Sequence, residues 1–314
     1  TTTLTFKASE IAGTADAYTI NFNADSTAAL DAGTVAIAGI ETININSVGK
    51  TGAANTIDLK DVDAKSVVIT GNTNLTIEVD VTKLGTVANA TNGLGVSTID
   101  ASASTAGITI AAVDFVDINT AWSGLTIKGG AGADSITTGA TAAKALTIET
   151  GAGIDTINLT SATTATDKII VNAGAGDDTV TLGATGGTFT LGAGKDTIDV
   201  KAAAVAGGNV TVATGAIKTT ITDIEKGDII KFTATGTFTQ ANVSAATDLD
   251  SALTAAANGA ANTKTWFQYA GNTYVVDNVD ATAGIQNTDV IVKLNGLVDL
   301  SNSSFGGTAD LTIA

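Results

Sequence analysis

Residues 129–136 read Gly129-Gly130-Ala131-Gly132-Ala133-Asp134-Ser135-Ile136, and closely similar stretches occupy residues 150–157, 173–180 and 191–198. Each copy has glycines at alternate positions, then an aspartate, then a hydroxyl residue and an apolar residue. Glycine allows positive φ angles, so such a loop can turn its backbone carbonyls toward one point. The apolar residue after each aspartate is expected to point into the core and to set the register of a strand.

The ligand chemistry of these loops suits a hard cation. Calcium takes six to eight oxygen ligands from carboxylates and backbone carbonyls. We therefore predict that the four loops bind Ca²⁺. The predicted ligand residues are Gly129, Gly130, Gly132, Asp134, Gly151, Gly153, Asp155, Gly174, Gly176, Asp177, Asp178, Gly192, Gly194 and Asp196.

The spacing of the aspartates gives independent support for a coil. Successive aspartates are 21, 23 and 18 residues apart. A coil made of two nine-residue halves takes about 18 residues. The loops are therefore expected to stack on one side, one per coil, with the opposite turns at 138–145, 160–167 and 183–188 lacking the motif.

Short alternating strand signals recur along the chain, and no segment keeps a helical period apart from one candidate short helix within residues 245–261. The sequence thus predicts an all-β fold: a right-handed parallel β-solenoid with calcium loops and a β-rich C-terminal cap. The expected strands cover residues 42–45, 56–59, 66–69, 75–79, 98–100, 108–110, 125–127, 146–148, 156–159, 169–171, 179–182, 197–200 and 209–212.

Composition excludes several functions. The 314 residues contain no Cys, His, Pro, Met or Arg, so disulfides, ordinary zinc sites and Ser-His-Asp or Cys-His catalysis are impossible. The net charge of -16 disfavours nucleic acid and anionic membranes as partners. No apolar run is long enough to span a membrane, and no signal peptide is apparent at the start. We expect no enzyme activity.

Stacking makes the metal necessary. Neighbouring rungs lie about 4.8 Å apart, and two bare carboxylates at that distance repel by roughly 1 kcal/mol in water, and by more when desolvated. A whole domain is stable by only about 5–15 kcal/mol. We therefore expect residues 125–200 to be largely disordered without calcium.

The loops resemble the calcium-binding nonapeptide of RTX proteins, although Thr150, Ala173 and Leu191 replace the first glycine. Residues 38–45, the tail at 266–276 and 289–294, and the closing Leu-Thr-Ile-Ala resemble the C-terminal part of RTX surface-layer proteins. That resemblance implies a secreted structural protein at the bacterial surface that self-assembles with calcium. It also implies export by the type I secretion machinery, with a signal at the C-terminus, and contact with cell-surface polysaccharide through an upstream region.

The resemblance divides the chain into three parts: solenoid rungs without glycine loops at 1–124, a calcium-binding β-roll at 125–215, and a cap with the secretion signal at 216–314. Residues 222–230 are expected to cap the array. The alternative function is a folding and secretion module of a larger secreted enzyme or adhesin; a third candidate, glycoside cleavage by the solenoid itself, needs a carboxylate pair.

Two alternative roles remain open for some other acidic residues and for a cluster of aromatic residues. The carboxylates of Asp58, Asp61, Asp63 and Asp100 either bind further calcium or lie in solvated turns. Asp223 and Asp228 either bind calcium directly or serve only as part of the cap. The aromatic cluster is either a small capping core or a sugar-binding platform: Trp266, Phe267, Tyr269 and Tyr274.

Overall fold

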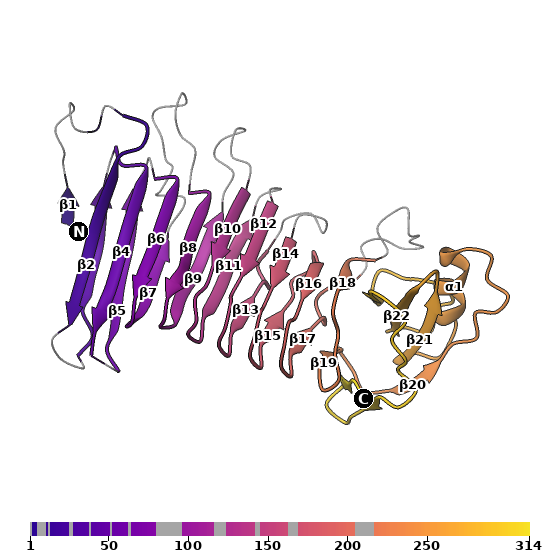
Figure 1. Cartoon of the computed structure of the whole chain (residues 1–314). Helices are drawn as coiled ribbons and strands as arrows, with labels where there is room; N and C mark the ends of the chain where they lie inside the picture. Colours follow the sequence, from indigo (N-terminus) through magenta and orange to yellow (C-terminus); the bar gives the residue numbers. More distant parts are fainter. Residues whose placement is uncertain are drawn as a thin grey trace.

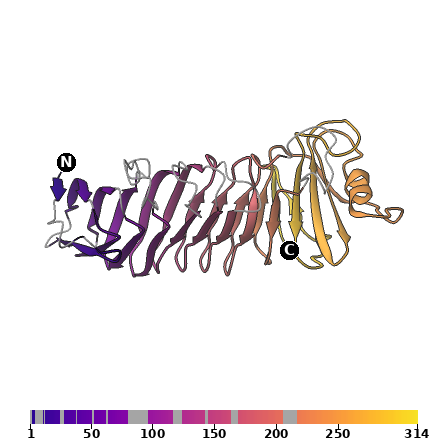
Figure 2. The same cartoon turned by 90° about the horizontal axis from the view of Figure 1, so that it is seen from above.

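The chain is organised as two long sheets of alternating strands, in a computed structural model that describes residues 2–4, 11, 13–24, 28–37, 39–50, 52–61, 64–79, 96–115, 124–141, 145–162, 169–204 and 217–314. As far as β19, odd-numbered strands belong to one sheet, sheet A, and even-numbered strands to the other, sheet B. The strands stack into an elongated body with the N-terminus at one end and the C-terminal region at the other (Figures 1 and 2).

The strands of sheet A, in spatial order, are β1 (Thr2–Leu4), β3 (Asp31–Ile37), β5 (Ala54–Asp61), β7 (Asn74–Val79), β9 (Ile108–Phe115), β11 (Ser135–Thr141), β13 (Thr156–Asn158), β15 (Thr179–Thr181), β17 (Thr197–Asp199), β19 (Ile229–Lys231), β25 (Asp310–Thr312) and β24 (Ser304–Phe305). The strands of sheet B are β2 (Ala17–Ala24), β4 (Thr42–Gly49), β6 (Ser66–Gly71), β8 (Thr98–Ser104), β10 (Gly124–Lys128), β12 (Ala145–Glu149), β14 (Ile169–Asn172), β16 (Gly187–Thr190), β18 (Thr219–Ile221), β23 (Val290–Leu294), β22 (Asn272–Asn278), β21 (Thr263–Tyr269) and β20 (Thr237–Gln240).

Along the solenoid, each strand pairs in parallel with the strand two places further along the chain. Leu125, Leu146 and Ile169 are consecutive partners in sheet B, so like residues stack on like. The predicted parallel solenoid of alternating strands is confirmed. The predicted strand at 209–212 lies outside the described residues, as does Asp63.

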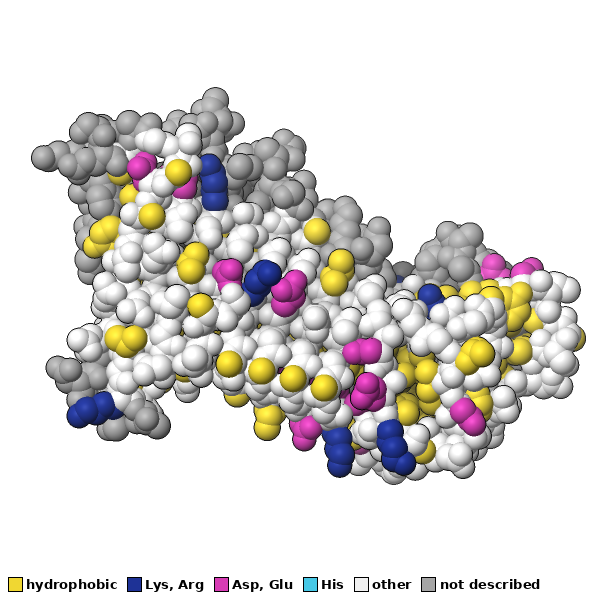
Figure 3. Space-filling model, viewed as in Figure 1, with side chains coloured by type: hydrophobic (Ala, Val, Ile, Leu, Met, Phe, Trp, Pro, Cys, Tyr) yellow, Lys and Arg dark blue, Asp and Glu magenta, His cyan; other side chains and the backbone are white. Residues whose placement is uncertain are grey.

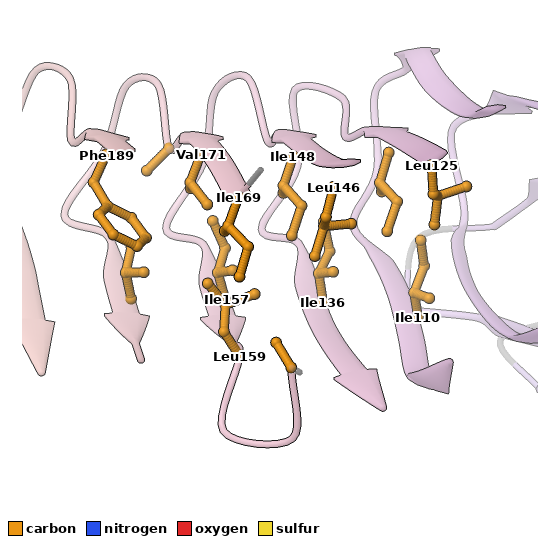
Figure 4. Close-up of a cluster of buried hydrophobic side chains, with 14 of the residues drawn as sticks. Ile110, Leu125, Ile136, Leu146, Ile148, Ile157, Leu159, Ile169, Val171 and Phe189 are labelled. Carbon is orange, nitrogen blue, oxygen red and sulfur yellow. The ribbon is translucent and has the colours of Figure 1, made fainter. Parts of the chain in front are cut away.

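Side chains at every second position fill the narrow space between the sheets. Burying one such aliphatic side chain stabilises the fold by about 1.5–3 kcal/mol, so a long stack of them forms a core without many aromatic residues. Figure 4 shows the side chains of the two layers pointing toward one another. The buried residues of the glycine-loop coils include Ile127, Ile136, Ile148, Ile157, Val171, Val180, Phe189 and Ile198.

The C-terminal region covers the last coil. Strand β18 pairs in parallel with β23, and β19 pairs with β25 in antiparallel, so both sheets continue into this region. Strands β23, β22 and β21 are antiparallel neighbours. The one helix of the described chain, α1 (Leu249–Ala256), confirms the helix expected within residues 245–261. It is too short to cross a membrane, and no helix of the described residues can do so.

The aromatic residues serve as core. Trp266 is buried in the main core, whereas Phe267 and Tyr274 belong to a second core that includes α1. The rings of Phe267 and Tyr274 are stacked, with centroids 5.2 Å apart. Residues 222–228 form a further loop between β18 and β19, so they add one more rung to the solenoid, and the strands that follow close it.

Candidate metal centre

A column of buried aspartates runs along one edge of sheet A. Each aspartate of the four loops immediately precedes a strand of this sheet, and each has 1–2% of its surface exposed. The strand registers align Ser135, Thr156, Thr179, Thr197 and Ile229. The residues just before them therefore stack one above another. They are the four predicted aspartates and, as a fifth member of the column, Asp228: Asp134, Asp155, Asp178, Asp196 and Asp228.

Each aspartate side chain reaches back to the rung before it. The backbone N–H of Asp134 donates to Oδ1 of Asp155 at 2.7 Å. The same bond joins Asp155 to Asp178 at 2.8 Å, and Asp178 to Asp196 at 2.8 Å. The N–H of Asp196 donates to Oδ1 of Asp228 at 3.0 Å. One oxygen of each carboxylate thus holds two successive loops together and fixes the stacking predicted from the spacing.

The second carboxylate oxygen, Oδ2, is hydrogen bonded at the two ends of the column but not in its interior. Oδ2 of Asp134 accepts the N–H of Gly130 at 2.9 Å, and Oδ2 of Asp228 accepts the N–H of Glu225 at 2.7 Å. In contrast, Oδ2 is buried and has no hydrogen-bond partner in the three interior members: Asp155, Asp178 and Asp196. A buried oxygen of a carboxylate without a partner is costly, so these three oxygens are where a cation or a proton would relieve the cost of burial.

The column has a defined start. Ile108 donates its N–H to Oδ1 of Asp134 at 2.7 Å, and Ile108 pairs with Leu75, which pairs with Asn55. The positions above Asp134 are therefore filled by two apolar residues and one amide. The aspartates occupy core-facing positions that upstream coils fill mostly with hydrocarbon.

Burial makes these carboxyl groups hard to ionise without a cation. It raises the pKa of Asp134 and Asp178 to about 6 and that of Asp196 to about 7. Burial also raises the pKa of Asp155 and of Asp228. Neighbouring carboxylates add to the effect at Asp196, where Asp228 and Asp178 both oppose its ionisation.

The glycines take the same geometry in three of the four loops. Gly151, Gly174 and Gly192 have φ of 97°, 100° and 100°, and Gly153 and Gly176 both have φ of 140°. The glycines of the first loop do not appear among the positive-φ residues of the described chain. The loop that best matches the sequence motif is thus the exception in structure, and the three with a substituted first position are regular.

The glycines also permit close stacking, and this can be tested at Gly192. A Cβ there would overlap the backbone carbonyl of Gly174 in the preceding loop. We expect Gly192→Ala to cost about 3 kcal/mol of unfolding free energy, from the left-handed backbone and the overlap together. Gly296→Ala is the matched control, because Gly296 has φ of 88° but open space around it. It should cost about 1 kcal/mol. Equal losses in thermal melts of the two variants would contradict this account.

Other predicted acidic residues lie outside the column. Asp177 is exposed, and its Oδ1 accepts the N–H of Lys195 at 2.9 Å. Asp58 accepts the hydroxyl of Thr34 at 2.7 Å. Asp100 accepts the hydroxyl of Ser102 at 2.6 Å, and this bond lowers the pKa of Asp100. Within the described ranges, no three acidic side chains converge on a single point, so an ion at the column would also need backbone oxygens.

In the fifth loop, backbone N–H groups donate to all the carboxylate oxygens of Asp223 and Asp228. Oδ1 and Oδ2 of Asp223 accept the N–H groups of Leu191 and Gly192, at 2.8 and 2.9 Å. Both oxygens of Asp228 are also hydrogen bonded. In the sequence, the Gly227-Asp228-Ile229 pattern was the signal for this extra rung, although its spacing of 32 residues from Asp196 hid it.

No protein-family model matches this chain, and no curated protein matches it either. The fold and the site therefore define its class by themselves. The chain is a parallel β-solenoid of two long sheets with a column of stacked, buried aspartates at one edge.

Proposed function

We propose that this chain is part of a calcium-dependent structural protein of a bacterial surface layer, a right-handed RTX β-roll that folds and assembles outside the cell. The proposal that the chain binds calcium rests on the three buried carboxylate oxygens in the column that have no hydrogen-bond partner. The surface-layer part is supported by the resemblance of residues 38–45 and of the C-terminal tail to proteins of that kind.

The residues present fit calcium. The interior carboxylates supply anionic oxygens, and the glycine loops supply backbone carbonyls, which are the ligands that Ca²⁺ prefers. Each carboxylate reaches toward the preceding loop, so each of the three free oxygens lies between two loops. We therefore propose three ions, held between successive loops by Asp155, Asp178 and Asp196. The end members have both oxygens hydrogen bonded.

Calcium binding at these places would drive folding. Binding stabilises a folded state when the site does not exist in the unfolded chain, and this site exists only when distant loops are stacked. Extracellular calcium modules have dissociation constants of about 10⁻⁴–10⁻³ M, so the chain would stay unfolded at cytosolic calcium levels. That behaviour suits export as an unfolded chain by the type I machinery, followed by folding at the cell surface.

A structural role agrees with the form of the molecule. The body is a stack of similar rungs, and the face in Figure 3 shows only scattered charged side chains over the solenoid. Such a shape offers long, repetitive surfaces for contact between copies. Nothing in the described site pairs a nucleophile with a base, and the chain lacks both His and Cys.

Negative-stain electron microscopy tests the surface-layer role. At millimolar calcium and high protein concentration, we expect the chain to form ordered two-dimensional arrays, which should dissolve when calcium is chelated. A magnesium-treated sample is the control, because Mg²⁺ demands a smaller, near-octahedral site. Dispersed monomers at every calcium concentration would count against assembly by this chain and leave the calcium site to be judged by its own experiments below.

A further inference from the structure

A fully buried ion pair lies in the C-terminal region, far from the aspartate column in the sequence. Lys264 in β21 and Asp277 in β22 are direct partners across two antiparallel strands. Nζ of Lys264 lies 3.0 Å from Oδ1 of Asp277, with side-chain exposures of 0% and 1%. No other Lys or Arg among the described residues is so completely enclosed.

The pair is poorly compensated for its burial. Neither the Lys264 ammonium nor either oxygen of Asp277 makes a well-aligned hydrogen bond. Removing two charges from water costs several kcal/mol each, and their attraction offsets this only when further hydrogen bonds satisfy both groups. The arrangement is therefore an unfavourable one for two full charges.

The surroundings favour the neutral form of the Asp277 carboxyl and place the Lys264 amine in an apolar space. Burial raises the pKa of Asp277, and the nearby carboxylate of Asp289 raises it further, against the opposing effect of Lys264. The Phe305 ring lies 5.6 Å from Nζ of Lys264 and packs against Phe232 and Phe238, so the space beside the amine is aromatic. A desolvated lysine amine is a good nucleophile.

We propose that Lys264 and Asp277 join in an intramolecular isopeptide bond that cross-links strands β21 and β22. The two reacting groups lie across from one another, within contact distance, in a closed interior. Holding two groups in such a geometry gives effective concentrations of about 10⁵–10⁸ M in favourable cases. The bond would replace two buried charges by one neutral amide.

The reaction is a condensation that needs no oxidant or cofactor. A proton passes from the Lys264 ammonium to the Asp277 carboxylate, which leaves an amine and a carboxylic acid. The Nζ lone pair then forms a bond to Cγ of Asp277, a second proton moves from nitrogen to a hydroxyl oxygen, and the C–O bond breaks. One water molecule leaves, and the amide joins Nζ to Cγ.

Intact-mass spectrometry of the full chain, folded in calcium, tests the proposal directly. The mass should be lower than that of the sequence by one water, about 18 Da. Trypsin should also fail to cleave after Lys264, and fragmentation should show the peptides of residues 264 and 277 joined. A full-length mass equal to the sequence mass would overturn the proposal, and this result does not depend on any variant folding.

Two variants separate the cross-link from other losses of water. Lys264→Met keeps the length of the side chain but removes the nucleophile, and Asp277→Ala removes the electrophile. Both should show the full sequence mass. If Lys264→Met still lacked one water, the loss would come from a cyclic imide at an aspartate, and the isopeptide bond would be ruled out. Asp289→Asn should retain the loss, because its carboxylate is not a reacting group.

Discussion

In excess chelator, the backbone N–H groups of Asp134, Asp155 and Asp178 are expected to lose their protection from hydrogen exchange. Each donates to the carboxyl group of the next rung, and each such bond requires the loops to be stacked. At the rung spacing of about 4.8 Å, neighbouring carboxylates repel by about 3 kcal/mol at an effective dielectric constant near 20. Several such pairs together approach the 5–15 kcal/mol by which a domain is stable.

Circular dichroism and hydrogen exchange measure this result together. The β signal should fall on chelation and return with calcium, and protection should be lost across residues 125–200. The hairpin of β21 and β22 is the internal control, because Phe267, Tyr274 and Val276 pack with α1 in the second core, which contains no residue of the glycine loops. A chain that keeps its full β signal and slow exchange at Asp155 and Asp178 in chelator would show that the column is stable without metal.

Replacing Asp178 by Asn is expected to remove one calcium ion and to lower stability only when calcium is present. The amide keeps an oxygen to accept the N–H of Asp155 but replaces the free anionic oxygen with a donor. A site filled at 100 times its dissociation constant contributes about 2.7 kcal/mol. Titration calorimetry should therefore give three ions for the natural chain and two for Asp178→Asn, with a lower melting temperature in calcium.

Asp199→Asn is the matched control for charge. Asp199 lies in the same part of the solenoid but forms a surface pair with Lys201 at 3.0 Å, and such pairs contribute about 0–1 kcal/mol. The Asp199→Asn variant should bind three ions and have a melting temperature close to that of the natural chain. The opposite result at Asp178, an unchanged or higher melting temperature in calcium, would mean that its carboxyl is a neutral core group and that no ion binds there.

Much of the site could be predicted from spacing alone. Aspartates 18–23 residues apart, each followed by an alternating strand, can stack only if the chain coils with that period. The register of β11, β13 and β15 confirms this stacking. The place of Asp228 was harder to see, because a long insertion before it breaks the period.

The sequence by itself determined the coil, the side on which the loops stack, and the alternation of side chains that points each aspartate inward. All three follow from local periodicity. Only the tertiary structure decided which carboxylate oxygens lack partners, since that depends on the N–H groups of the neighbouring rungs. Gly130 and Glu225 satisfy the two ends of the column and leave its interior open. The same holds for Lys264 and Asp277, whose pairing depends on the register of a hairpin and on the aromatic side chains that close around it.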